Sequence, residues 1–177
     1  MSEKPANPGR REIIKGAVLS AAFAPGVLRQ GAMGPLRFFT PEEFLLLDGL
    51  TEVIIPTDEH SPGASSARVA EYIDMVVSEA PAERQQLWRD GLKAVETLSI
   101  EMAGAKFMKV GVNSRIEVLT RLAGNEDKPV KMAEKFFREL KALTVKAYYT
   151  SKIGIHTEMQ YKGNVYLKEY VGEDLTS

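Results

Sequence analysis

The feature that most constrains this chain is the spacing of its apolar residues, which return every three or four positions after residue 38. This spacing matches the 3.6-residue turn of an α-helix and gathers the apolar side chains on one face. It predicts a mostly α fold, a single domain of about five helices. The five apolar stripes are Phe44, Leu47, Leu50 and Ile54; Val69, Ile73, Val76 and Val77; Trp88, Leu92, Val95, Leu98 and Met102; Ile116, Val118, Leu119 and Leu122; and Phe136, Leu140, Leu143 and Ala147.

Local signals predict where several of these helices begin and end. Thr40, Pro41 and Glu43 form a capping box with proline at the first helical position, and Pro56 ends that helix. Proline at position 81 restarts the chain before the third stripe. A second capping box is expected at Ser114 and Glu117, with Gly124 ending the short helix that follows, and the last helix is expected over residues 131–150.

The one stretch with strand-like alternation is Tyr161 to Val171, which fits a short C-terminal hairpin around Lys162-Gly163-Asn164. The expected organisation is a signal segment over residues 1–30, a linker over 31–37 and a helical domain over 38–177.

Composition excludes several kinds of site. The chain has no cysteine and two histidines, which excludes disulfides, thiolate-ligated clusters and sites that need several imidazoles. Its formal net charge of −1 gives no reason to expect binding to nucleic acid. No glycine-rich phosphate loop is present. We therefore expect no catalytic, cofactor or metal site in this chain.

The first thirty residues have the organisation of an export signal. Arg10 and Arg11 precede Ile13, Ile14 and Lys15, and an uncharged apolar run of about thirteen residues follows, whereas a membrane span needs about 20. The order resembles the twin-arginine signal of bacterial export, which implies the twin-arginine translocase as a partner and a periplasmic location. The alternative is an ordinary N-terminal amphipathic helix.

Two segments resemble the gluconate 2-dehydrogenase subunit 3 family. One runs from Phe39 to Asp74 and includes Ile54-Ile55-Pro56-Thr57-Asp58 and Ser61-Pro62-Gly63-Ala64; the other is Glu158 to Tyr166. Family members often finish with a Gly-Cys-x-His tail, whereas this chain reads Gly172-Glu173-Asp174 and lacks both the cysteine and the histidine.

The resemblance implies a helper subunit in a complex with a flavoprotein dehydrogenase of the glucose–methanol–choline type and a cytochrome c. FAD would lie in the flavoprotein and haem c in the cytochrome, so this chain would hold neither. The complex would be associated with the inner membrane.

Polar residues in the two resembling segments are candidates for contact with a partner: Asp58, His60, Pro62, Tyr161, Gly163 and Tyr166. An alternative for Asp58, Glu59, His60, His156 and Glu158 is a metal site, which would need both ends of the domain to meet. The C-terminal tyrosines, with Tyr148 and Tyr149 among them, suit either a docking surface or the core.

The leading interpretation is a non-catalytic small subunit that binds a flavin-dependent sugar or sugar-acid dehydrogenase and supports its maturation and export. The alternative is a free-standing periplasmic helical enzyme or ligand-binding domain, with a pocket between residues 58–61 and 158–166.

Overall fold

A computed structural model describes residues 34–59 and 61–159, and these residues form one all-helical domain. Its five long helices confirm the number expected from the apolar stripes. The helices are α1 (Pro41–Ile54), α2 (Gly63–Ser66), α3 (Val69–Ser78), α4 (Ala82–Ala103), the 3₁₀ turn η2 (Phe107–Lys109), α5 (Val112–Ala123), α6 (Met132–Thr150) and the π turn η3 (Gly154–Glu158). No strand occurs in the described part of the chain.

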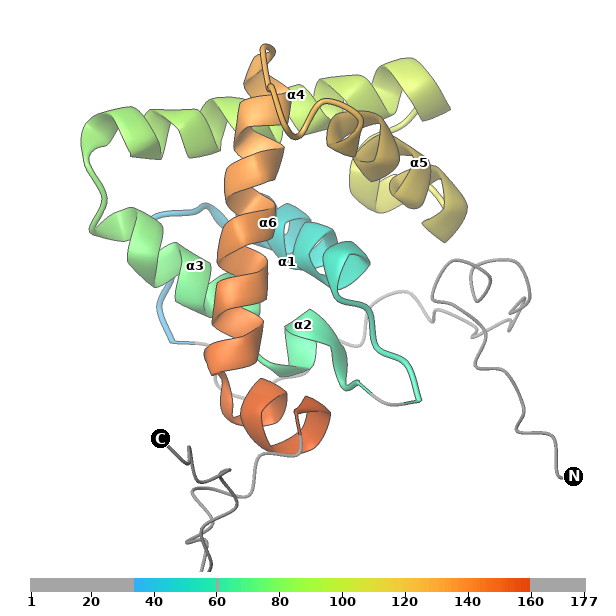
Figure 1. The fold of residues 1–177 in the computed structure, drawn as a ribbon. Helices are drawn as coiled ribbons and strands as arrows, with labels where there is room; N and C mark the ends of the chain where they lie inside the picture. The colour runs from blue at the N-terminus through green and yellow to red at the C-terminus, as the bar shows by residue number, and fades with distance from the viewer. Residues whose placement is uncertain (1–33, 60, 160–177) are drawn as a thin grey trace, which may run out of the picture. The chain divides into compact units, whose positions relative to one another are not determined.

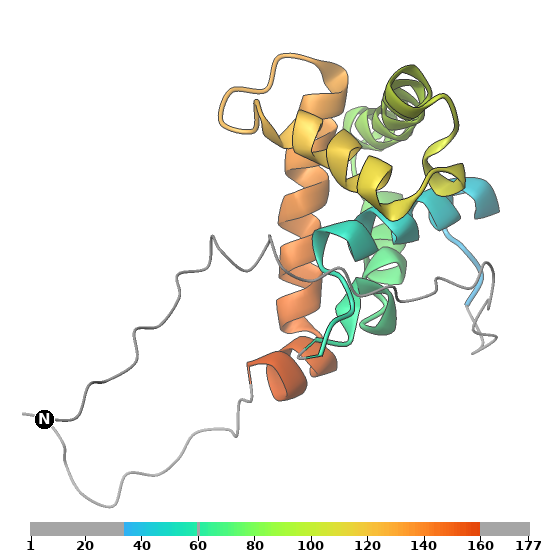
Figure 2. The same ribbon diagram turned by 90° about the vertical axis from the view of Figure 1, so that its right-hand side faces the viewer.

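Helix α6 is the central element of the domain. It packs against α1, α3, α4, α5 and η3, and Figure 1 shows it in orange, with α4 crossing its upper end and α3 beside its lower half. Turning the molecule by 90° shows α5 above α1, both beside α6 (Figure 2). The short α2 and η3 lie near the lower end of α6, so two segments far apart in the sequence share one end of the domain.

Helix α1 begins where the capping box predicts. The backbone N–H of Glu43 donates to the Thr40 hydroxyl, and the Glu43 carboxylate accepts from the Thr40 N–H at 2.9 Å. Both bonds satisfy first-turn amides that have no helical partner. The helix ends at Ile54, two residues before Pro56, because a residue that precedes proline is disfavoured in helical geometry.

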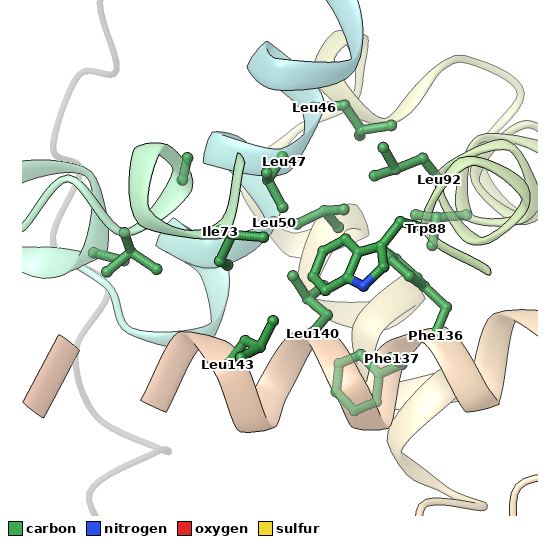
Figure 3. Packing of buried hydrophobic residues seen from close by; sticks show 14 of the residues in the cluster. Leu46, Leu47, Leu50, Ile73, Trp88, Leu92, Phe136, Phe137, Leu140 and Leu143 are labelled. Carbon is green, nitrogen blue, oxygen red and sulfur yellow. The ribbon is translucent and has the colours of Figure 1, made fainter. Parts of the chain in front are cut away.

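The core gathers around Trp88, the only tryptophan of the chain. Figure 3 shows its indole entering the space between Leu50 of α1 and Leu140 and Phe136 of α6. The indole meets the Phe136 ring edge-on, with centroids 5.2 Å apart, and its N–H donates to Glu139 at 2.9 Å. The predicted stripe of α6, including Phe136 and Leu140, is buried throughout.

Asp74 fastens the segment before α1 to α3. Although almost fully buried, its carboxylate is satisfied because it accepts three backbone N–H groups, from Arg37 at 2.7 Å, Phe38 at 3.0 Å and Phe39 at 2.9 Å. Amides that converge on a buried carboxylate offset its desolvation. The result is that Phe39 is seated against Trp88, with ring centroids 6.0 Å apart.

Three details expected from the sequence are wrong. Helix α5 begins at Val112 with Gly111 as its N-cap, so Ser114 lies inside the helix and caps nothing. Met102 and Ile116 belong to predicted apolar stripes, yet their exposed fractions are 44% and 48%. Met102 lies in the last turn of α4, and Ile116 lies in the first half of α5, where it lines a surface groove.

The start of α6 is held by a carboxylate with an altered pKa. Glu134 accepts the backbone N–H groups of Lys131 and Val130 and the side-chain amide of Asn125. These bonds, first that from Lys131, lower the pKa of Glu134 from 4.5 to about 2.

This shift gives a pH-dependent stability. A carboxyl group with a lowered folded-state pKa stabilises the fold fully above its unfolded pKa and loses that contribution as the pH falls through the folded value. We expect the difference in thermal midpoint between the wild-type chain and Glu134→Gln to shrink as the pH falls from 4.5 to about 2. A difference that stays constant over this range would contradict the assignment.

The signal segment over residues 1–30, residues 31–33 of the linker and the expected hairpin lie outside the described residues. Within residues 34–59 and 61–159, no helix has the length and apolar character needed to cross a membrane.

Candidate functional site

The segment Thr57 to Ala64, here called the motif loop, is held in shape by its own polar groups. The Asp58 N–H donates to the Ser61 carbonyl at 2.8 Å, and the Ser61 N–H donates back to the Asp58 carboxylate at 2.7 Å. Glu52, in the last turn of α1, accepts the N–H of Thr57 and that of Ser65, both at 2.9 Å. The loop is therefore tied to the helices on both sides of it.

Gly63 is required by this geometry. Its φ of +75° lies in the left-handed region, which side-chain-bearing residues rarely adopt. A Cβ at this position would lie 2.4 Å from the Thr57 hydroxyl oxygen and 2.6 Å from a carboxylate oxygen of Glu52. The backbone conformation and the close contacts at position 63 thus explain why the Ser61-Pro62-Gly63-Ala64 motif has a glycine there.

A hydrogen-bonded chain joins the motif loop to the end of α6 and to η3. The Ser61 and Tyr148 hydroxyls lie 2.5 Å apart, and the Tyr148 hydroxyl donates to the Glu158 carboxylate at 3.3 Å. Because Tyr148 has one hydroxyl proton and gives it to Glu158, Ser61 is the donor in their pair. The backbone N–H of Gly63 in turn donates to the Ser61 hydroxyl at 3.3 Å. Tyr148 therefore connects Ser61 of the first family-like segment to Glu158, the first residue of the second.

Tyr148 is neutral in this arrangement. Its side chain is fully buried, and burial, with the nearby Glu158 carboxylate, raises the pKa of its hydroxyl above the ordinary value of 10.0. Tyr149, by contrast, is 38% exposed and donates to the other oxygen of Glu158. Tyr148 therefore belongs to the core, whereas Tyr149 reaches the surface.

Removing the Tyr148 hydroxyl measures how much its hydrogen bonds to Ser61 and Glu158 contribute to stability. Tyr148→Phe is expected to lower the free energy of unfolding by about 1 kcal/mol, since Ser61 and Glu158 each lose one bond but keep another. Thermal denaturation followed by circular dichroism would show a midpoint about 3 °C lower. The matched control, Tyr149→Phe, is expected to shift the midpoint much less because that hydroxyl is exposed. Equal shifts would contradict the buried connection.

The described structure places some of the predicted contact residues. Asp58 is exposed and Pro62 half-buried, and both lie in the motif loop beside Ser61. Four other candidates, His60, Tyr161, Gly163 and Tyr166, lie outside the described residues, as do the signal residues Arg10, Arg11, Ile13, Ile14 and Lys15. No local pattern predicts the Ser61–Tyr148 pair, because 87 positions separate the two residues.

For the metal alternative, the geometry offers no ligand set within residues 34–59 and 61–159, where no three His, Asp or Glu residues are grouped to hold an ion. Glu158 is instead engaged by the two tyrosine hydroxyls.

Two surface grooves lie away from the motif loop. One encloses about 340 Å³ and is lined mostly by apolar side chains of α1, α5 and α6, among them Val53, Ile116 and Phe137. The other encloses about 720 Å³ beside α4, α6 and the turn between α5 and α6. Neither groove includes a residue of the motif loop or of η3.

These features define an all-helical domain with an ordered loop at one end and grooves on its surface. The profile of the family described as gluconate 2-dehydrogenase subunit 3 matches residues 41–165, and the chain belongs to this family. Membership implies a small subunit of such a dehydrogenase complex, with dehydrogenase subunits as partners. No curated protein and no solved structure matches the sequence.

Proposed function

We propose that this chain is the non-catalytic small subunit of a flavin-dependent sugar or sugar-acid dehydrogenase complex. It binds the flavoprotein subunit, supports its maturation and supplies the twin-arginine export signal for both. The observation that carries the proposal is membership of the subunit 3 family over residues 41–165, together with the Arg10-Arg11 signal that precedes the match.

The geometry of the motif loop supports a docking role for this end of the domain. Asp58 is exposed on a loop whose backbone is fixed by Glu52 and Ser61, and a fixed loop loses little conformational entropy on binding. Tyr148 bonds both to Ser61 of this loop and to Glu158, where the second family-like segment begins. The residues proposed to contact the partner are Asp58, His60, Pro62, Tyr161, Gly163 and Tyr166.

In the proposed complex the redox groups belong to other subunits. Electrons pass from the substrate to FAD in a flavoprotein of the glucose–methanol–choline type and then to haem c in a cytochrome subunit. The complex works on the periplasmic side and is associated with the inner membrane. Residues 1–30 serve as the signal, 31–37 as a linker and 38–177 as the subunit domain.

Co-expression tests maturation directly. The flavoprotein subunit would be expressed in its native host with this chain and without it, and the FAD bound per flavoprotein would be measured from the absorbance of the purified protein. We expect flavin occupancy and dehydrogenase activity to fall when the chain is deleted and to return when it is supplied. Full occupancy and activity without the chain would refute a role in maturation.

The free-standing alternative predicts a different result. A lone chain that oxidises a sugar or a sugar acid with an artificial electron acceptor, with no flavoprotein in the preparation, would establish an enzyme in its own right and overturn the small-subunit proposal.

A further inference from the structure

The larger groove is lined by apolar residues and by a rim of charged ones. Its apolar lining consists of Leu87 of α4 and Pro129 of the α5–α6 turn, both half-buried, and Ala142 of α6, which is exposed. It is wide and open along the surface, unlike the enclosed pockets that surround most of a small ligand. Its form therefore suits a segment of a macromolecule better than a small molecule.

The rim carries three cations, Lys128, Lys135 and Arg138. All three are exposed, and none forms an ion pair with another residue in the described part of the chain. Lys135 and Arg138 are three residues apart on α6 and so lie on the same face of that helix.

The negative charges beside the groove are fewer and partly engaged. Asp127 and Glu139 are its two carboxylates. Glu139 forms an ion pair with Arg84 and accepts the indole N–H of Trp88, so it is already committed to the packing of α4 on α6. Asp127 is therefore the one lining carboxylate without such a structural role. The same lining contains three cations that form no ion pair in the described part of the chain. The groove has an excess of positive charge in a chain whose net charge is −1.

We propose that this groove binds an acidic, amphipathic segment of the flavoprotein subunit, an inference that rests on the proposed function. Carboxylates of the segment pair with Lys128, Lys135 and Arg138, while its apolar side chains cover Leu87, Pro129 and Ala142. From Lys135 to Ala142 α6 rises about 10 Å, which matches roughly two turns of a partner helix with acidic residues three or four positions apart.

Charge complementarity favours this groove over the apolar groove on the other side of α6. The smaller groove has one cation among its lining residues, Lys141, and Glu126 already pairs with it at 2.6 Å. Nothing there specifies the chemistry of an occupant. The rim of the larger groove does specify it, because unpaired cations around an apolar lining select a partner with negative charge.

Charge reversal tests the proposal in the native host. Three tagged chains would be purified: the wild type, the groove variant Lys128→Glu/Lys135→Glu/Arg138→Glu, and the control Lys93→Glu/Lys106→Glu/Arg121→Glu. Each would be purified at about 50, 150 and 300 mM salt, because the Debye length falls over this range and weakens exposed ion pairs. The control reverses three exposed cations that line neither groove. The readout is flavin absorbance per chain in the eluate.

We expect the groove variant to bring down about tenfold less flavin than the wild type at 150 mM salt and the control to differ little from the wild type. Circular dichroism and thermal midpoints would confirm that all three chains fold. If the charge-reversed groove variant does not fold, the neutral variant Lys128→Gln/Lys135→Gln/Arg138→Gln would replace it in the purification. Flavin retention at the wild-type level in the groove variant, or an equal loss in the control, would overturn the proposal.

Carbodiimide cross-linking of the purified complex tests the acidic partner itself, because this reagent joins a lysine amine to a carboxylate in contact with it. We expect cross-links from Lys128 and Lys135 to Asp or Glu residues of the flavoprotein. Cross-links from these lysines only to a second copy of this chain would instead assign the groove to self-association and refute the inference. If the wild-type chain brings down no flavin at all, the proposed function itself fails.

Discussion

Replacing Trp88 with alanine is expected to lower the free energy of unfolding by about 4 kcal/mol, a large part of the roughly 5–15 kcal/mol that stabilises a domain of this kind. The side chain is fully buried and lies between α1, α4 and α6 (Figure 3). Its removal leaves a cavity beside Leu50 and Leu140 and deprives Glu139 of a hydrogen-bond donor. Chemical denaturation followed by circular dichroism would measure the change.

The conservative variant Trp88→Phe separates packing from hydrogen bonding. It keeps an aromatic ring against Phe136 but removes the indole N–H, and Glu139 keeps its ion pair with Arg84. We expect it to cost about 1–2 kcal/mol. If the alanine variant were no less stable than the phenylalanine variant, the central role of Trp88 would be wrong.

The second large effect concerns export. Changing Arg10 and Arg11 to lysine is expected to abolish export of this chain and to strand its flavoprotein partner in the cytoplasm, because a receptor reads the arginine pair rather than its charge alone. Cell fractionation with immunoblotting of both proteins would measure the distribution.

Arg29→Lys makes the same chemical change after the apolar run, and we expect it to leave export intact. A partner that still reaches the periplasm with the Arg10-Arg11 pair replaced would contradict the shared export signal, even if this chain were retained.

Local patterns in the sequence were sufficient to predict the five long helices of the domain. The Thr40 cap and the four-three-four spacing of α6 appear in the structure as expected, because capping and periodicity act within a few residues. The capping box expected at Ser114 failed for a related reason: a serine three residues before a glutamate satisfies the pattern wherever it lies, and here the helix had already begun at Val112.

The long-range features could not be predicted because no local signal encodes them. Asp74 accepts amides from residues 35 to 37 positions earlier, and Tyr148 contacts Ser61 across 87 positions. Gly91 lies inside α4, where glycine weakens a helix, and the structure gives the reason. A Cβ there would lie 2.1 Å from the ring of Phe136, so glycine permits the close approach of α4 to α6.

The small-subunit proposal is tested most directly by the partner that copurifies with this chain. The decisive measurement is an affinity purification of the tagged chain from its native host, with an absorbance spectrum and mass spectrometry of the eluate. We expect a yellow complex that contains a flavoprotein dehydrogenase of the glucose–methanol–choline type. A colourless chain that purifies alone, from cells that make an active dehydrogenase, would contradict it.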